Sequence, residues 1–195
     1  DAVRGGAAGV LCQEPRGIDG QLVTCVLVPD TEAALLQWAR YILQKHRTTV
    51  IAVTGSVGKT GTKEALAAVL GQQSRVFRNR ASFNGKYGLP IALGRLEPEH
   101  NLAVLELGSD HLGEIAQLAD LTRPTFGVIT AVAPAHLEAL QSLEQVAHEK
   151  GSLVETLPRH GMAVLNWDDP WVQQMAARTV ARVLRVGMHD GVDIQ

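Results

Sequence analysis

Residues 49–60, Thr-Val-Ile-Ala-Val-Thr-Gly-Ser-Val-Gly-Lys-Thr, decide the fold of this chain. Residues 49–54 form a continuous apolar run of strand length, which is typical of a central strand buried on both faces. A tight loop follows from Gly55 to Gly58, and a helical pattern then begins at Lys59 and continues to residue 73. A strand, a glycine loop and a helix in this order predict a phosphate-binding loop. The glycines let backbone N–H groups turn inward, and the helix N-terminus adds the positive end of its dipole.

The side chains of this loop indicate a nucleotide triphosphate with magnesium. Lys59 is expected to reach the β- and γ-phosphates, and the Thr60 hydroxyl to bind Mg²⁺. The spacing falls short of the full GxxxxGK[ST] pattern, because Val53 stands five residues before the second glycine, and a chance Gly-Lys-Thr at a helix start is the alternative. The expected nucleotide-binding residues of the loop are Gly55, Ser56, Val57, Gly58, Lys59 and Thr60.

Away from the loop, short apolar runs alternate with helical segments, which favours βαβ units and a parallel sheet. We expect strands at residues 8–12, 24–28, 49–54, 75–77, 102–107, 126–130, 163–165 and 182–186. We expect helices at residues 31–45, 59–73, 89–96, 113–121, 143–157 and 171–177. The predicted fold is α/β: a three-layer P-loop domain with a mostly parallel sheet over residues 48–195, preceded at residues 1–47 by the end of a smaller α/β domain.

Composition narrows the function classes. The 195 residues carry a net charge of −2 and no basic run longer than two residues, so neither nucleic acid nor a membrane surface is an expected partner. No apolar stretch reaches the roughly 18 residues of a spanning helix. Cys12 and Cys25 lack CxxC spacing and are interpreted as reduced strand thiols. A cytoplasmic enzyme is the expectation, monomeric by default.

Four further residues stand near predicted strand ends or on a helix, and three of them have two interpretations. Glu106 closes the strand at 102–107, where a carboxylate could hold the magnesium of a triphosphate or simply end the strand. His136 lies in an apolar stretch and suits a ligand or a core histidine equally. On the residues alone, an ordinary surface position explains Lys150. Asn166 could contact an adenine edge or form a turn with Asp168.

These motifs together resemble the Mur ligase family, the ATP-dependent amide ligases of peptidoglycan assembly. Within the family, the likeness is to the ligases that add D-alanyl-D-alanine to a UDP-muramoyl tripeptide. The order and spacing of the motifs extend through nearly all of residues 48–187, and residues 28–31 resemble the end of the family's N-terminal, UDP-sugar-binding domain. The stretches that carry the resemblance are 54–60, 88–90, 106–108 with His111, 113–115, 121–124, 135–138, 150–151 and Asn166 with Asp168.

The resemblance implies a set of roles. Thr60 and Glu106 would hold one Mg²⁺, and His136 with a carbamylated Lys150 would hold a second. Asn166 would lie near the adenine of ATP, and Asn84 near the phosphates. Lys59, His136 and Lys150 would be the catalytic group, acting on an acyl phosphate formed between a UDP-muramoyl peptide and ATP, with D-alanyl-D-alanine as the incoming amine. A bacterial cytoplasmic location follows from the same likeness.

The chain also departs from the family pattern. Residues 82–85 read Ser-Phe-Asn-Gly where the family has an Asn-rich segment, so only Asn84 is retained there, and Asp110 replaces a more usual Asn. Both ends of the chain resemble cut ends of a domain, and we expect the chain to contain no counterpart of the family's C-terminal domain. We therefore expect a piece of a longer protein that cannot turn over by itself.

Three other functions compete with this interpretation. One is a related ligase of the same superfamily, of the folylpolyglutamate, cyanophycin or poly-γ-glutamate synthetase type. Another is a P-loop GTPase or kinase, against which stand Glu106 in place of an Asp and the lack of an Asn-Lys-x-Asp motif. The third is a nucleotide-binding module without catalysis, although the presence of Lys59, Glu106, His136 and Lys150 argues against it.

Overall fold

The structure is a computed structural model, and it describes residues 3–15, 17, 23–80, 83–134 and 140–195. Eight strands are assigned in this part of the chain: β1 (Gly9–Cys12), β2 (Thr24–Leu27), β3 (Thr49–Thr54), β4 (Val76–Arg78), β5 (Leu102–Glu106), β6 (Phe126–Ile129), β7 (Met162–Asn166) and β8 (Arg182–Val186). The helices are α1 (Thr31–His46), α2 (Lys59–Leu70), α3 (Gly88–Leu93), α4 (Glu114–Thr122), α6 (Leu143–Glu155), α7 (Pro170–Gln174) and the short 3₁₀ helix η1 (Met175–Arg178).

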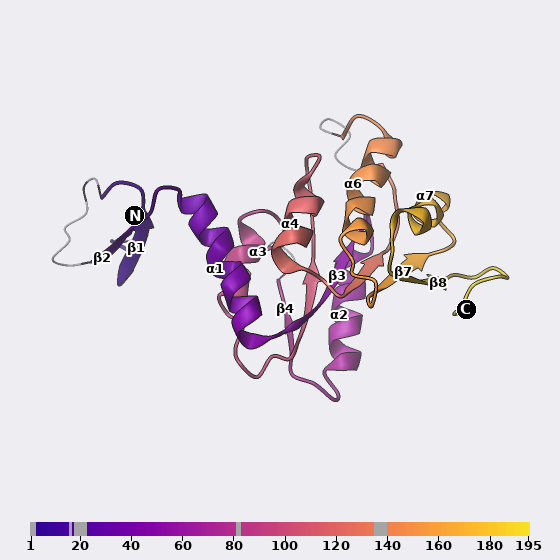
Figure 1. The fold of residues 1–195 in the computed structure, drawn as a ribbon, viewed down its shortest axis with the longest axis horizontal. Helices are drawn as coiled ribbons and strands as arrows, with labels where there is room; N and C mark the ends of the chain where they lie inside the picture. The colour runs from indigo at the N-terminus through magenta and orange to yellow at the C-terminus, as the bar shows by residue number, and fades with distance from the viewer. Residues whose placement is uncertain (1–2, 16, 18–22, 81–82, 135–139) are drawn as a thin grey trace.

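Six strands form one sheet in the order β4-β5-β3-β6-β7-β8, and every pairing in it is parallel (Figure 1). β3 lies in the middle, with β5 on one side and β6 on the other, so the chain reverses its direction of winding there. Ligands of open parallel sheets bind at the carboxyl ends of the strands beside such a reversal. The loop that follows β3 therefore lies where this kind of sheet binds its ligand.

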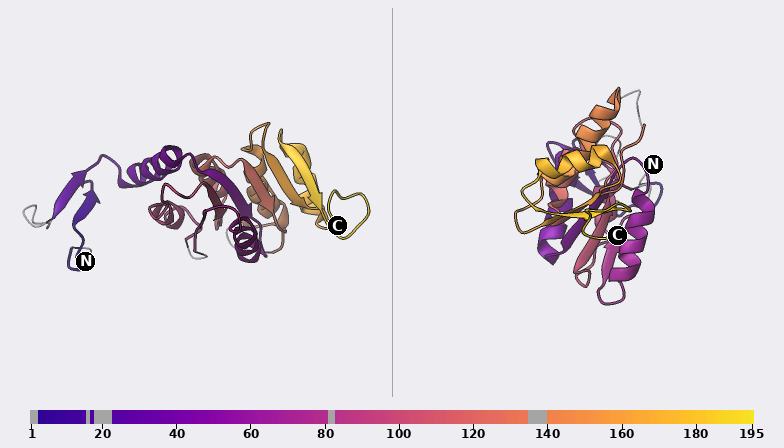
Figure 2. Two further views of the ribbon diagram at one scale, coloured as in Figure 1. Left: turned by 90° about the horizontal axis from the view of Figure 1, so that it is seen from below. Right: turned by 90° about the vertical axis from the view of Figure 1, so that its right-hand side faces the viewer.

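Helices cover both faces of this sheet and make three layers (Figure 2). On one face the larger core joins buried side chains of the sheet, such as Ala52 and Leu105, to helical residues such as Leu93, Leu118 and Leu153. On the other face α2 covers Val53 and Val104 with Ala67. Successive side chains of β3 and β5 therefore pack into two different cores, one on each face of the sheet. This arrangement confirms the expected α/β fold with its parallel sheet.

The expected elements are confirmed, and the differences lie at their ends. The helix predicted to reach residue 73 ends at Leu70. Gly71 N still bonds four residues back, to Ala67 O at 2.9 Å, but Gln72 N and Gln73 N bond three residues back, to Val69 O and Leu70 O, both at 3.2 Å. Such bonds tighten the last turn and end an α-helix. The strand expected at 75–77 lies one residue later, at Val76–Arg78.

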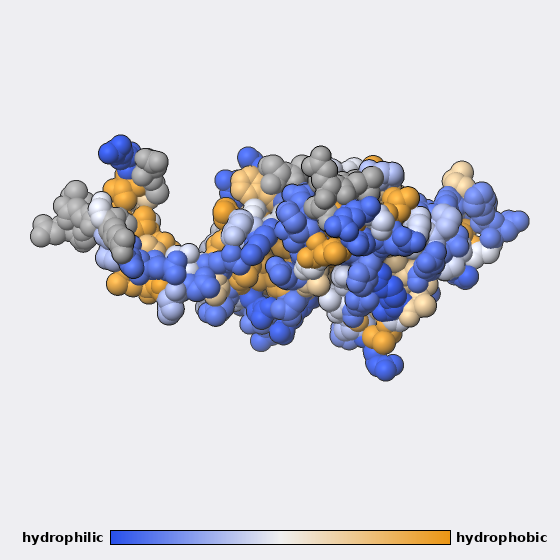
Figure 3. Space-filling view, turned by 90° about the horizontal axis from the view of Figure 1, so that it is seen from above, coloured by the Kyte–Doolittle hydropathy of each residue, from blue (hydrophilic) through white to orange (hydrophobic). Residues whose placement is uncertain are grey.

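β1 and β2 form a separate two-stranded parallel sheet at the N-terminal end of the molecule (Figure 1). Large apolar side chains are exposed on it, with Leu11, Val26 and Leu27 at 44%, 52% and 58%, and Figure 3 shows apolar residues gathered there. The following helix α1 belongs to the larger core, to which it contributes Ala39 and Leu43. The division of the chain at residue 47 stays a prediction.

Asp30 starts α1 by accepting hydrogen bonds from Glu32 N at 2.8 Å and Ala33 N at 3.0 Å, as its place before the helical pattern predicts. None of the helices in the described part of the chain is both long enough and apolar enough to cross a membrane.

Candidate nucleotide-binding site

The loop between β3 and α2 has the backbone that its two glycines allow. Gly55 and Gly58 have φ angles of 142° and 84°, which side chains rarely permit. A Cβ atom at Gly55 would overlap the Thr130 hydroxyl and come within 3.0 Å of the backbone of Ala131. Ser56 N donates to Ala131 O at 2.7 Å, and Thr130 Oγ1 donates to Val57 O at 2.6 Å. The end of β6 thus holds the loop against the sheet.

Lys59 opens α2 and folds back over this loop. Its Nζ donates to Gly55 O at 2.7 Å and to Ser56 O at 3.0 Å. Burial lowers the pKa of Lys59, and the negative charge of Glu106 opposes that shift. The Ser56 hydroxyl is buried and has no hydrogen-bond partner among the described residues. An ammonium beside a buried hydroxyl that lacks a partner suits an anion such as a phosphate.

Glu106, at the end of β5, lies beside the loop and is 2% exposed. Its Oε2 accepts from Thr60 Oγ1 at 2.8 Å and its Oε1 accepts from Asn84 Nδ2 at 2.9 Å. A third group, the Lys63 ammonium, lies 3.7 Å from Oε2. The structure therefore brings together three of the predicted residues, Thr60, Asn84 and Glu106, although 46 residues separate Thr60 from Glu106.

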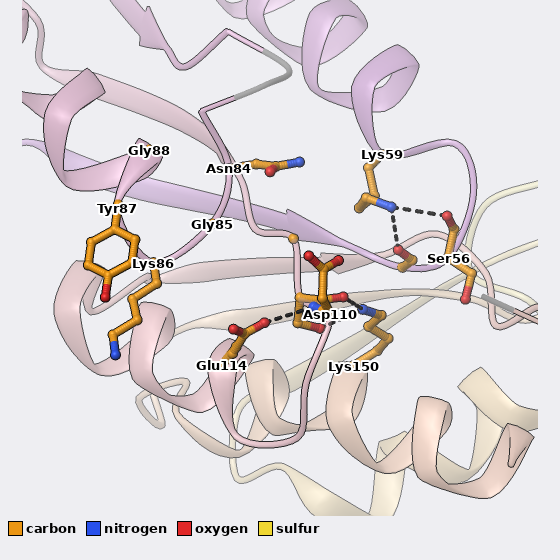
Figure 4. Close-up of a pocket in the computed structure, with 13 residues that line it drawn as sticks. Ser56, Lys59, Asn84, Gly85, Lys86, Tyr87, Gly88, Asp110, Glu114 and Lys150 are labelled. Carbon is orange, nitrogen blue, oxygen red and sulfur yellow. Dashed lines mark hydrogen bonds between the residues drawn. The ribbon is translucent and has the colours of Figure 1, made fainter. Parts of the chain in front are cut away.

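A pocket of about 540 Å³ opens beside these residues (Figure 4). Lys59 reaches it from α2 and Lys150 from α6, with Asp110 and Glu114 on the segment between them (Figure 4). Residues 84–88 form the remaining wall. Cations from two helices thus face a single polar cavity, which suits a ligand that carries several negative charges.

Lys150 is not the surface residue that the sequence alone suggests, because it is only 2% exposed. Its Nζ donates to Ser109 Oγ at 2.7 Å. Burial lowers the pKa of Lys150 to about 8, and the positive charge of Lys59 contributes to the shift, whereas Glu149 opposes it. A fraction of this amine is therefore neutral, and nucleophilic, near neutral pH.

Sequence reasoning missed three buried polar residues that hold the site. Lys63 is 0% exposed and Asn79 is 1% exposed, and both contact Glu106. Glu149, at 1%, accepts from Gly113 N at 2.6 Å and from Ile115 N at 2.7 Å, which fixes the start of α4 beside Lys150. The spacing of Lys63, one helical turn after Lys59, was an available signal for a shared face. For Asn79 the signal was its position shortly after the predicted strand at 75–77.

Two further predicted residues are His136 and Asn166. His136 lies outside the described residues. Asn166 donates to Thr130 O at 2.7 Å and accepts from Asp168 N at 3.1 Å, which confirms the turn-forming interpretation, and it does not line the pocket described above. The adenine contact of Asn166 stays a prediction.

The donors at the site fit a magnesium ion that is held mainly by phosphates. Among the described residues no group of three or more His, Cys, Asp and Glu side chains is placed to hold a metal. Glu106 and Thr60 offer one carboxylate and one hydroxyl, 2.8 Å apart. Magnesium sites in phosphoryl-transfer proteins use such a small protein set and take further oxygens from the substrate and water.

The parallel sheet and the glycine loop after its central strand define a P-loop nucleotide-binding domain. The model of the Mur ligase middle domain matches residues 53–195, and the chain belongs to the Mur ligase family. The resemblance inferred from the motifs is thereby confirmed.

Named relatives agree with this assignment. The chain is 38% identical to the UDP-N-acetylmuramoyl-tripeptide--D-alanyl-D-alanine ligase of Escherichia coli strain K12 over 185 residues, covering 93% of this chain and 40% of the relative. The crystal structure of MurF ligase from Thermotoga maritima in complex with ADP matches with a TM-score of 0.85 and 30% identity, over 98% of this chain and 44% of that one. A MurF structure from Acinetobacter baumannii matches with a TM-score of 0.87 and 27% identity, over 98% and 41%. The chain thus spans about 40% of the length of these relatives.

Proposed function

We propose that this chain is the nucleotide-binding part of an ATP-dependent ligase that joins D-alanyl-D-alanine to a UDP-muramoyl tripeptide. The observation that carries the proposal is the meeting of Lys59, Thr60 and Glu106 at the carboxyl end of the central strands, beside one polar pocket. The names of the relatives support the substrates, and the ADP complex of the Thermotoga relative supports the nucleotide.

Each part of the loop has a role in this proposal. The backbone N–H groups of residues 55–60 bind the phosphates, and Lys59 exchanges its bonds to the loop carbonyls for bonds to the β- and γ-phosphate oxygens. Thr60 and Glu106 would hold Mg²⁺, which when bound neutralises part of the charge of the triphosphate. Asn84 keeps the Glu106 carboxylate in place through its 2.9 Å hydrogen bond.

The proposed reaction has two steps. A carboxylate oxygen of the tripeptide attacks the γ-phosphorus, and the bond from that phosphorus to the bridging oxygen breaks, which gives an acyl phosphate and ADP. The amine of D-alanyl-D-alanine then attacks the acyl carbon, a proton leaves the nitrogen, and inorganic phosphate departs. No side chain of this chain forms a covalent bond with substrate, so its part is to position the groups and neutralise their charge.

The first test is a calorimetric titration of this chain with Mg·ATP and, separately, with Mg·GTP. We expect ATP to bind and GTP not to bind. Lys59→Ala should weaken ATP binding by about 100-fold, because a charge-assisted contact contributes up to about 3 kcal/mol. Lys45→Ala, at an exposed lysine of α1, is the matched control and should leave the affinity unchanged. Undiminished ATP affinity in Lys59→Ala would contradict the assignment of the loop.

We further propose that Lys150 carries a carbamate, which with His136 would hold a second Mg²⁺. The neutral amine attacks carbon dioxide: a C–N bond forms, one C–O π bond breaks, and the nitrogen releases a proton. The product is a carbamate with one negative charge shared by two oxygens, which can bind a cation. The pKa of about 8 and the burial of Lys150 support this chemistry.

Carbamylation is measurable by NMR with ¹³C-labelled bicarbonate. We expect a carbamate signal in the unaltered chain that is lost in Lys150→Met and retained in Lys45→Met. A signal that persists in Lys150→Met, or none in the unaltered chain, would remove the modification from the proposal. A bacterial cytoplasmic location and a monomeric state stay predictions.

A further inference from the structure

We propose that Lys63 is a positioning residue for Glu106: its buried ammonium supplies, before magnesium binds, the positive charge that holds this carboxylate at the nucleotide site. The inference rests on the proposed metal-binding role of Glu106, and it concerns a lysine that neither the loop motif nor the pocket lining includes. Lys63 lies one helical turn after Lys59 in α2.

The position of Lys63 is fixed by its surroundings. The residue is 0% exposed, and its Nζ donates to Asn79 O at 2.6 Å. Two carboxylates lie near this ammonium, Glu106 Oε2 at 3.7 Å and Glu64 Oε1 at 3.2 Å. Glu64 is the closer, yet its side chain is 46% exposed and also pairs with Arg78 at 2.7 Å, so water and a second cation weaken its hold on Lys63.

Asn79 links Lys63 to the backbone of Glu106. Its Oδ1 accepts from Glu106 N at 2.8 Å, and its Nδ2 donates to Glu106 O at 3.0 Å and to Phe83 O at 2.8 Å. β4 ends at Arg78, so the Asn79 side chain replaces the next pair of bonds that the β4–β5 ladder would have made. Lys63, through the Asn79 carbonyl, therefore fixes the place of Glu106 as well as facing its charge.

Magnesium binding is compatible with both partners of Glu106 Oε2. Thr60 Oγ1 donates its proton to Oε2, and its lone pairs stay available to a metal ion. Lys63 is a longer contact and is tied to Asn79, so it stays in place. Among the described residues of the metal-free protein, Lys63 is the cation paired with the Glu106 carboxylate at 3.7 Å, and Lys59 also interacts with that carboxylate electrostatically. Glu106 is 2% exposed, and a buried charge without a nearby opposite charge is strongly disfavoured.

The ion pair is tested without metal, and therefore independently of the proposed function. Thermal unfolding of this chain is compared for Lys63→Met, Glu106→Gln and the double variant. We expect each single substitution to lower the midpoint temperature of unfolding, and the double variant to lower it by clearly less than the sum of the two. Each single change removes a partner of the other buried charge, and the double variant removes that charge as well. Additive losses would overturn the proposal.

The link to magnesium is tested by adding Mg²⁺ to the same proteins saturated with ADP. Magnesium replaces the positive charge that Lys63→Met lacks, so Mg²⁺ should raise the midpoint temperature of unfolding more in this variant than in the unaltered chain. In the control, Lys45→Met, Mg²⁺ should raise it by the same amount as in the unaltered chain. Equal gains in Lys63→Met and the unaltered chain would overturn the proposal. If Mg²⁺ stabilises none of the proteins, the metal role of Glu106 fails instead, and the double-variant comparison alone decides the role of Lys63.

If Lys63→Met does not fold, the unaltered chain provides the readout. The ¹⁵N resonance of the Lys63 ammonium should shift when Mg²⁺ is added to the ADP complex, because a second cation then reaches its carboxylate partner. A resonance that does not move when Mg²⁺ stabilises the protein would overturn the proposal.

Discussion

The central sheet and the β1–β2 sheet are both parallel, but they differ in how deeply their strands are buried. Four of the five residues of β5 are buried, whereas none of the four residues of β2 is. β5 has a strand on each side and helices over its faces, and β2 has a single strand as its neighbour. The candidate site lies entirely on the first sheet.

The difference shows what a phosphate-binding loop needs from its fold. The two strands that flank β3 supply Glu106, at the end of β5, and Thr130, directly after β6, to the loop from fixed positions, because each strand is held in register by its pairing with β3. A two-stranded sheet is marginally stable by itself in water. Among the described residues, the β1–β2 sheet lacks the flanking strands that fix the loop in the central sheet.

Gly55→Ala is expected to have the largest effect on the buried region. The new methyl group would overlap Thr130 and force a side chain into a φ of 142°, so we expect a loss of at least about 3 kcal/mol in the free energy of unfolding and loss of ATP binding. Gly61→Ala is the matched control: nothing lies within 4 Å of its Cβ position, and alanine in place of a helical glycine should stabilise by about 0.5 kcal/mol. Denaturant unfolding and calorimetry measure both. A stable, ATP-binding Gly55→Ala protein would refute the loop geometry.

The contrast between the two sheets is measured directly by the same substitution in each. Val104→Ala, at a residue with 0% exposure in β5, should lower the free energy of unfolding by roughly 2 kcal/mol, since it leaves a cavity in the core. Val26→Ala, at 52% exposure in β2, should change it by less than about 0.5 kcal/mol. Equal losses in urea unfolding would mean that the β1–β2 sheet is as tightly packed as the central one.

The last expected effect is a dependence of stability on pH that comes from Lys150. Its pKa in the folded chain is about 8, against an ordinary value of 10.5. Between these two values the unfolded chain binds more protons than the folded one, so the contribution of Lys150 to stability rises with pH across this window. Thermal unfolding of the unaltered chain and of Lys150→Met should therefore diverge as pH rises through the window. Parallel curves would show that the pKa of Lys150 is not lowered in the folded chain.

The sequence by itself determined the strand–loop–helix motif, the alternation of strands and helices, and the family. Apolar runs such as residues 49–54 predict buried parallel strands from local composition, and glycine next to Lys59 predicts the loop, because both signals lie within a few residues. The sequence also placed Glu106 at a strand end, where the structure has it. The ends of helices were less certain, since the bonds that stop α2 at Leu70 depend on the local turn.

Only the tertiary structure decided which polar residues share the site. Strand order puts β4 beside β5 and β3 between β5 and β6, and this order brings Asn79 onto the backbone of Glu106. Packing of α6 buries Lys150, which a local pattern could not distinguish from a surface lysine. In the sequence, Lys63 likewise cannot be distinguished from an exposed polar residue of a helix. Its burial comes from the packing of α2 against the sheet. The physical reason is that burial and charge pairing depend on neighbours far apart in the chain, and no short stretch of sequence contains them.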